Sequence, residues 1–220
     1  MATAFNIGSS STISAGKITI TVGAGGVPQG SQIFVVFAEN SGSGTASVAD
    51  SASNTYFAQA TSNTGIGVYI FRETNLAALV NGNTIVITLS VGATLGAADA
   101  FYVVGLKTSA IDASQNASGS SSTPSVTSTT PTKQWDFFVG AVAGASVATP
   151  TQDSTNGAWS SPPGVVSSAA PVLVGGTLTR TAATAQTYAP TLNTSDVWCA
   201  TIVGYLTETI DMNSQSIMAP

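Results

Sequence analysis

Five carboxylates are the residues of this sequence that could take part in acid and base catalysis. Two of them brought close together in space could act as the acid and base pair of a glycoside hydrolase. Each one, however, lies near the end of an expected strand or in a turn, where an acid usually caps the turn or faces solvent. The structural role is therefore the preferred interpretation for all five, namely Glu39, Asp50, Glu73, Asp99 and Asp136.

Nucleophilic catalysis has little support in the sequence. The chain contains no histidine, so the Ser-His-Asp and Cys-His arrangements cannot form. The one cysteine, Cys199, lies in the apolar run 197–203 and is expected to be a small buried side chain. We predict that the chain is not an enzyme and has no catalytic residues.

A metal site is also not expected. Asp50 and Asn54 could offer oxygen ligands to calcium, but the twelve-residue calcium loop with acids at alternating positions is absent. Their spacing suits a turn in which the side chains accept or donate hydrogen bonds to nearby backbone groups. The sequence therefore predicts a turn here, no metal ligands and no cofactor.

Three aromatic residues are the candidates for contact with a ligand or a partner, because exposed rings stack on sugars and pack in interfaces. Trp159 stands out, since it lies between Gly157 and Ser160 in a long loop; Tyr56 and Tyr69 are the other two. Even for Trp159, packing in the core or in an interface is the preferred interpretation over ligand binding. The remaining tryptophans, Trp135 and Trp198, lie in apolar strands and are expected to be buried.

The charge content limits the possible partners. Charged residues make up 7% of the 220 residues, against roughly 25% in an average soluble domain. Five scattered Lys and Arg and a net charge of −5 argue against nucleic-acid binding, which requires clustered cations. No segment reads as a signal peptide or a membrane span. A surface covered by uncharged polar residues repels other molecules weakly and suits contact with copies or partners.

The pattern of apolar residues predicts an all-β fold. Residues 17–22 alternate strictly and predict a half-buried strand, whereas 33–38 are continuously apolar and predict a strand covered on both faces. Residues 112–132 are read as an edge strand and loop in preference to a linker. The sequence predicts an antiparallel β-sandwich or jelly-roll-like fold of about ten to twelve strands, as a single domain over residues 1–220.

Five features follow one another along the chain: the segment 50–56, the segment 83–89, the strand ending Gly105-Leu106, Asp112 with 117–121, and the segment 137–141. Taken in this order, they resemble a known module. The resemblance implies a β-sandwich of the kind found in bacteriophage structural proteins and large bacterial surface proteins, and it spans Ser31 to Gly204. That module usually has glycine before the Asn of the first turn, where this chain has Ser53. Its motifs describe strands and turns and bring no catalytic residues.

The functional hypothesis follows from this resemblance and from the uncharged composition. The chain is expected to be a structural subunit of a bacteriophage virion, foremost a capsid decoration (cement) protein made in the host cytoplasm. A tail or fibre component and a carbohydrate-binding adhesin module are the alternatives. The expected partners are copies of itself, major capsid or tail proteins, and host glycans on the adhesin reading. Met1–Ile7 and Met212–Pro220 are the expected assembly arms.

Overall fold

The computed structural model describes residues 2–41, 46–73, 77–134, 136–146, 149–166 and 170–207, without the side chains of residues 60, 63 and 108–110. The described part is all-β and contains no helix, so none that could cross a membrane. It has sixteen strands, more than the ten to twelve expected, and four of them have only two residues each. These are β1 Thr3–Ser10, β2 Ile13–Ser14, β3 Lys17–Thr21, β4 Gln32–Glu39, β5 Ser47–Asp50, β6 Tyr56–Asn63, β7 Gly67–Glu73, β8 Thr84–Thr88, β9 Gly96–Val104, β10 Leu106–Ser121, β11 Val126–Thr127, β12 Asp136–Gly144, β13 Val165–Val166, β14 Val172–Arg180, β15 Thr187–Tyr188 and β16 Asp196–Thr207.

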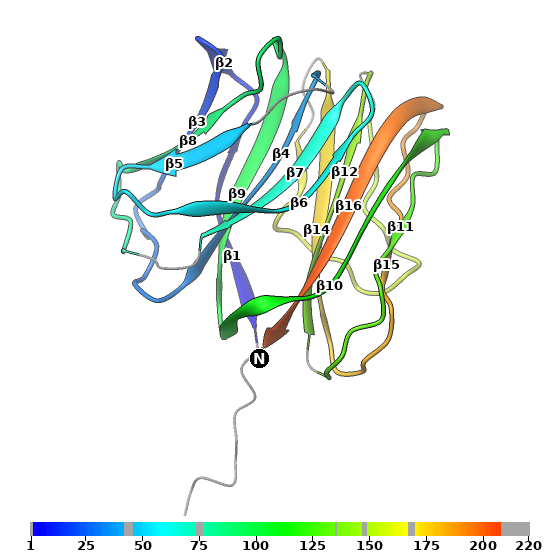
Figure 1. Cartoon of the computed structure of the whole chain (residues 1–220). Coiled ribbons are helices and arrows are strands. Elements are labelled where there is room, and N and C mark those ends of the chain that lie inside the picture. Colours follow the sequence, from blue (N-terminus) through cyan, green and yellow to red (C-terminus); the bar gives the residue numbers. More distant parts are fainter. Residues whose placement is uncertain are drawn as a thin grey trace, which may run out of the picture.

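The strands form antiparallel sheets that stack face to face (Figure 1). Sheet I has the order β2-β3-β8-β5, sheet II the order β1-β9-β4-β7-β6, and sheet III the order β10-β16-β12-β14-β13. A two-stranded ribbon, β11-β15, lies beyond sheet III. The predicted antiparallel, sandwich-like all-β fold is confirmed, but two of its sheets are covered on both faces.

Strand β4 lies between two cores, which explains why its sequence has no polar alternation. Its even-numbered residues Phe34 and Val36 belong to the core between sheets II and III. Its odd-numbered residues Ile33, Val35 and Phe37 belong to the core between sheets I and II. Because side chains alternate between the two faces of a strand, a strand in the middle layer must be apolar at every position. The prediction of a doubly covered strand is confirmed.

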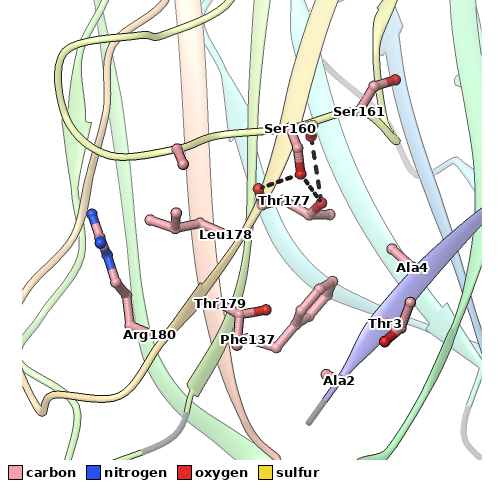
Figure 2. Close-up of a pocket in the computed structure, with 11 residues that line it drawn as sticks. Ala2, Thr3, Ala4, Phe137, Ser160, Ser161, Thr177, Leu178, Thr179 and Arg180 are labelled. Carbon is pink, nitrogen blue, oxygen red and sulfur yellow. Dashed lines mark hydrogen bonds between the residues drawn. The ribbon is translucent and has the colours of Figure 1, made fainter.

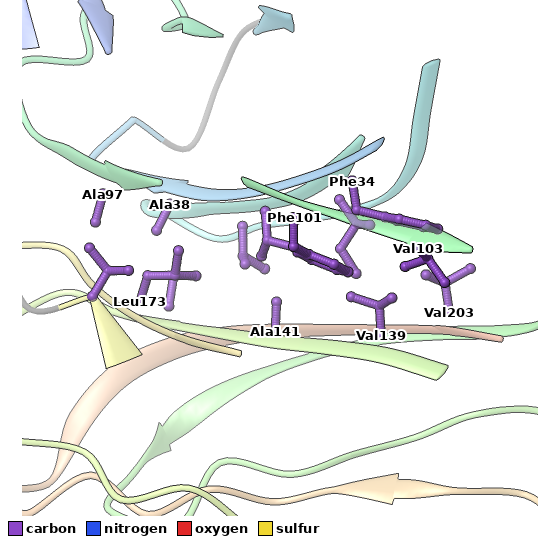
Figure 3. Close-up of a cluster of buried hydrophobic side chains, with 14 of the residues drawn as sticks. Phe34, Ala38, Ala97, Phe101, Val103, Val139, Ala141, Leu173 and Val203 are labelled. Carbon is purple, nitrogen blue, oxygen red and sulfur yellow. The ribbon is translucent and has the colours of Figure 1, made fainter. Parts of the chain in front are cut away.

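The core between sheets II and III joins the two halves of the chain. Strands β1 to β9 build sheets I and II, whereas β10 to β16 build sheet III and the ribbon. Phe34 and Phe101 of sheet II stack with ring centroids 5.3 Å apart, and they face Val139 and Val203 of sheet III (Figure 3). Each half therefore presents an apolar face that the other half covers.

A third core lies between sheet III and the ribbon. Trp159 packs there against Tyr188, and the Trp159 indole N–H donates to the carbonyl of Thr187 (2.9 Å). The buried carboxylate of Asp153 holds the surrounding loop, accepting hydrogen bonds from the backbone N–H groups of Thr155, Asn156 and Ala189. These three donors favour the charged form and hold the pKa of Asp153 below its usual value, although burial opposes them.

The segment 112–132 lies largely at an edge, as predicted. Residues up to Ser121 continue β10, whose only strand neighbour in sheet III is β16. The outer side of β10 is partly covered, because the Ser62 hydroxyl donates to the carbonyl of Ala117 and the Asn116 amide donates to the carbonyl of Thr61. Sheets II and III are thus held together along the side where β6 meets β10.

Of the two expected assembly arms, the structure describes most of the N-terminal one and none of the C-terminal one. Thr3–Ile7 is not an extended arm, because these residues form the first part of β1 and pair with β9 of the same chain. The reason is that β9 is a long apolar strand that needs a neighbour on this side. Met1 and Met212–Pro220 lie outside the described residues.

Candidate functional site

Both oxygens of the Asp50 carboxylate accept hydrogen bonds from residues of the turn that follows it. Its Oδ1 accepts from the backbone N–H groups of Ala52 (2.9 Å) and Asn54 (3.1 Å). Its Oδ2 accepts from the Asn54 side chain and the Tyr56 hydroxyl, both at 2.8 Å. Burial and the neighbouring Asp50 charge raise the pKa of Tyr56, so the phenol stays a donor. The predicted turn is confirmed, and these oxygens already have the partners that a cation would need to displace.

Ser53 in the same turn has an unfavourable backbone conformation. Its φ is 61°, in the left-handed region where a side chain costs about 1 kcal/mol and glycine costs nothing. We expect Ser53→Gly to raise the free energy of unfolding by about 0.5–1 kcal/mol, measured by urea denaturation. Ala52→Gly is the matched control, because Ala52 does not have a positive φ and should lose stability. A loss of stability in Ser53→Gly would contradict the prediction.

The three nominated aromatic residues do not form an exposed surface. Tyr56 belongs to the core between sheets I and II, where Tyr69 stacks on Phe37 with ring centroids 4.5 Å apart. Trp159 belongs to the core behind sheet III. Each is less than one-tenth exposed, so none presents a ring face to a ligand. Trp198 is buried as predicted, and Trp135 lies outside the described residues.

The five carboxylates that could have formed an acid and base pair do not line the two cavities beside β1. Glu39, at the end of β4, accepts from the Tyr69 hydroxyl (2.7 Å) and the backbone N–H of Ser90 (2.9 Å). Those cavities, of about 390 and 270 Å³, have no Asp or Glu in their lining. Among the described residues, no group of three potential metal-ligating acids, cysteines or histidines is found.

Burial removes most of the few charges from the surface. Six of the eight described carboxylates are buried, and Arg72 is buried with its guanidinium 4.7 Å from the centre of the Tyr205 ring. Among the described charged side chains, only Lys17, Lys107 and Lys133 are exposed, and the others are buried or half-buried. The buried carboxylates are Glu39, Glu73, Asp99, Asp136, Asp153 and Asp196.

A cavity of about 390 Å³ opens between β1 and β14 (Figure 2). Ala2, Thr3 and Ala4 form one side of it, and the buried ring of Phe137 also lines it. Hydroxyl groups line much of the rest, from Ser160 and Ser161 of the preceding loop and Thr177 and Thr179 of β14. Arg180 is the one charged residue of the lining. Its Nε–H donates a hydrogen bond to the side-chain oxygen of Gln186 (2.9 Å).

A second cavity, of about 270 Å³, lies on the opposite face of β1. Phe5 and Ile7 line it together with Tyr102 of β9 and the glycine-rich loop 23–26. Phe5 stacks on Tyr102 with ring centroids 5.0 Å apart and is 43% exposed. Phe5 was not predicted to lie in a strand, because Met1–Ile7 was expected to be an arm; an aromatic residue between Ala4 and Asn6 is, however, compatible with a strand.

These two cavities and the strand between them are the candidate site. The lining is neutral apart from Arg180 and contains apolar, hydroxyl and backbone groups, so it suits packing and hydrogen bonding rather than acid and base chemistry. No protein-family model matches this chain, and no curated protein matches it either. The resemblance to virion and surface-protein sandwiches therefore remains a hypothesis.

Proposed function

We propose that the chain is a structural subunit of a bacteriophage virion, foremost a capsid decoration protein that stabilises the particle through contacts between subunits. The observation that carries this proposal is the nearly uncharged surface described above. Charged groups keep most soluble proteins apart, and a protein that lacks them packs closely against neighbours with little electrostatic repulsion.

Exposed apolar side chains support the same proposal. Phe5, Phe57, Val80 and Val91 are each at least 43% exposed. Scattered exposed apolar residues are normal on a monomer, but here they lie on a surface that offers few charges to limit association. The tail or fibre alternative shares these features. The carbohydrate-binding alternative loses its nominated contacts, because Trp159, Tyr56 and Tyr69 are buried.

The test is to add the purified chain to virions from which this subunit has been removed. We expect stoichiometric rebinding, measured by co-sedimentation, that changes little between low and high salt. The reason is that contacts without ion pairs are barely affected by screening. A chain that stays in the supernatant at every concentration would refute the proposal, and binding that disappears at high salt would refute its physical basis.

A further inference from the structure

Strand β1 is the long open edge of this fold. Its only neighbour among the described strands is β9. The opposite edge of sheet II, β6, is linked to β10 by the hydrogen bonds of Ser62 and Asn116. β6 and β10 are thus long edge strands that face each other, and the remaining edge strands of the three sheets are short: β2 and β13 have two residues each, and β5 has four. An unpaired row of backbone N–H and C=O groups is therefore concentrated along β1.

The sequence of β1 has few of the devices that usually prevent edge-to-edge pairing. Thr3–Ser10 contains no proline and no charged residue. Natural edge strands are commonly protected by lysine, proline or a bulge. One bulge is present between Asn6 and Gly8, and pairing with β9 is regular on both sides of it, over Thr3–Asn6 and over Gly8–Ser10. Residues Thr3–Asn6 thus form the longer regular stretch of this neutral edge.

The two cavities flank this edge on opposite faces of sheet II. Ala4 packs towards the core between sheets II and III and lines the larger cavity. Phe5 lines the smaller cavity on the face towards sheet I, beside Tyr102. Because side chains of a strand alternate between faces, a strand added next to β1 would direct successive side chains to opposite faces of sheet II, with one cavity beside residues 2–4 and the other beside residues 5–7. This is the arrangement by which sheet edges select an added strand.

We infer that β1 pairs in antiparallel orientation with β1 of a second copy of this chain, centred on Phe5, so that sheet II continues from one copy into the other. A twofold axis perpendicular to the sheet keeps equivalent faces together. Phe5 then meets Phe5 of the second copy and extends the stack that begins at Tyr102. Ala4 meets the second copy's Asn6 on the face of the larger cavity.

A second copy fits this edge better than a charged partner does. The lining of the smaller cavity has no charged residue, so an identical neutral strand meets no repulsion there. Phe5 is the large apolar residue exposed at the centre of the pairing stretch, and pairing with itself removes both rings from water. The inference rests on the proposed structural role, since it names one contact through which such a subunit meets its neighbours.

The experiment uses the isolated full-length chain in sedimentation equilibrium. The native chain is expected to associate with increasing concentration. Phe5→Asp should weaken that association at least about tenfold, because two carboxylates would face each other at the centre of the pair. Val91→Asp is the matched control and should associate like the native chain, since Val91 is 94% exposed in a turn far from β1 in the sequence.

Mixing two variants of Phe5 with opposite charges distinguishes a loss of pairing from a loss of folding. Phe5→Asp mixed with Phe5→Lys should recover association, because opposite charges then face each other, whereas a misfolded strand would not recover. Phe5→Cys should form a disulfide between copies on oxidation, and Val91→Cys should not; Cys199 is buried and does not interfere.

Three results would overturn the inference: a native chain that remains monomeric, a Phe5→Asp chain that associates like the native one, or a mixture that does not recover. Rebinding of a monomeric chain to depleted virions would then show that the structural role holds and that only the β1 contact is wrong.

Discussion

Replacing Phe34 with alanine is expected to lower the free energy of unfolding by about 4 kcal/mol. Phe34 is completely buried between sheets II and III, and its ring stacks on Phe101 and meets the edge of Tyr205 at 5.2 Å. The change removes apolar burial and leaves a cavity that the rigid strands on both sides cannot close. Urea denaturation followed by tryptophan fluorescence measures the loss.

Phe57→Ala is the matched control, because Phe57 is 52% exposed at the β6 edge and its loss should cost much less. The shape of the transition also tests the single-domain prediction. If residues 3–104 and 106–207 form one cooperative unit, unfolding stays a single step in Phe34→Ala. Two separated transitions would show that each half folds by itself, and equal effects of the two substitutions would contradict the role assigned to Phe34.

Replacing Asp99 with asparagine is expected to stabilise the protein at pH 8 by up to about 4 kcal/mol. Asp99 lies on β9 between Ser9 of β1 and Val36 of β4 and is 5% exposed. Its Oδ1 has no hydrogen-bond partner in the described part of the chain, and the backbone N–H of Gly164 donates to the carboxylate. Burial raises the pKa of Asp99 from 3.8 to about 7, which corresponds to about 4 kcal/mol.

The direction of the pH dependence follows from this raised pKa. The folded protein binds the proton more tightly than the unfolded chain, so the contribution to stability is complete below about pH 4 and is lost as pH rises through about 7. Asp99→Asn should remove that dependence, because the amide does not titrate. Part of the slope should remain, since burial also raises the pKa of Asp136 to about 6.

Denaturation midpoints measured from pH 4 to pH 8 test this prediction. Asp50→Asn is the control, because Asp50 accepts four hydrogen bonds and its substitution should destabilise the turn. Identical pH profiles for the native chain and Asp99→Asn would show that Asp99 is ionised at little cost, and the prediction would fail.

The candidate site illustrates where local pattern stops being informative. Phe5 and Ala4 were read as part of an arm because a single alternating stretch of small residues does not show which strand pairs with it. Trp159 was kept as a candidate surface contact, behind the preferred interpretation of core or interface packing, because its neighbours are glycine and serine; Tyr188, far along the chain, packs against its ring. Both outcomes depend on contacts between residues distant in sequence.

Local patterns in the sequence were enough to predict the class of the fold and several of its parts. Alternation at 17–22, the continuous apolar run at 33–38 and the Asp50 turn each depend on neighbours within a few residues, so local periodicity and side-chain chemistry predict them. The absence of histidine likewise removed whole classes of catalysis without any structure.

The stacking of the sheets, the burial of the carboxylates and the open strand edge depend on contacts between distant parts of the chain, so local patterns did not predict them. The order of the layers depends on which apolar faces meet. The apolar sequence of β4 indicates that both faces of the strand are covered, but it does not indicate which sheets cover them. Glu39 and Asp99 are polar in sequence, yet packing of other strands encloses them. The neutral edge of β1 between its two cavities exists because β9 takes one side of the strand and no other described strand takes the other.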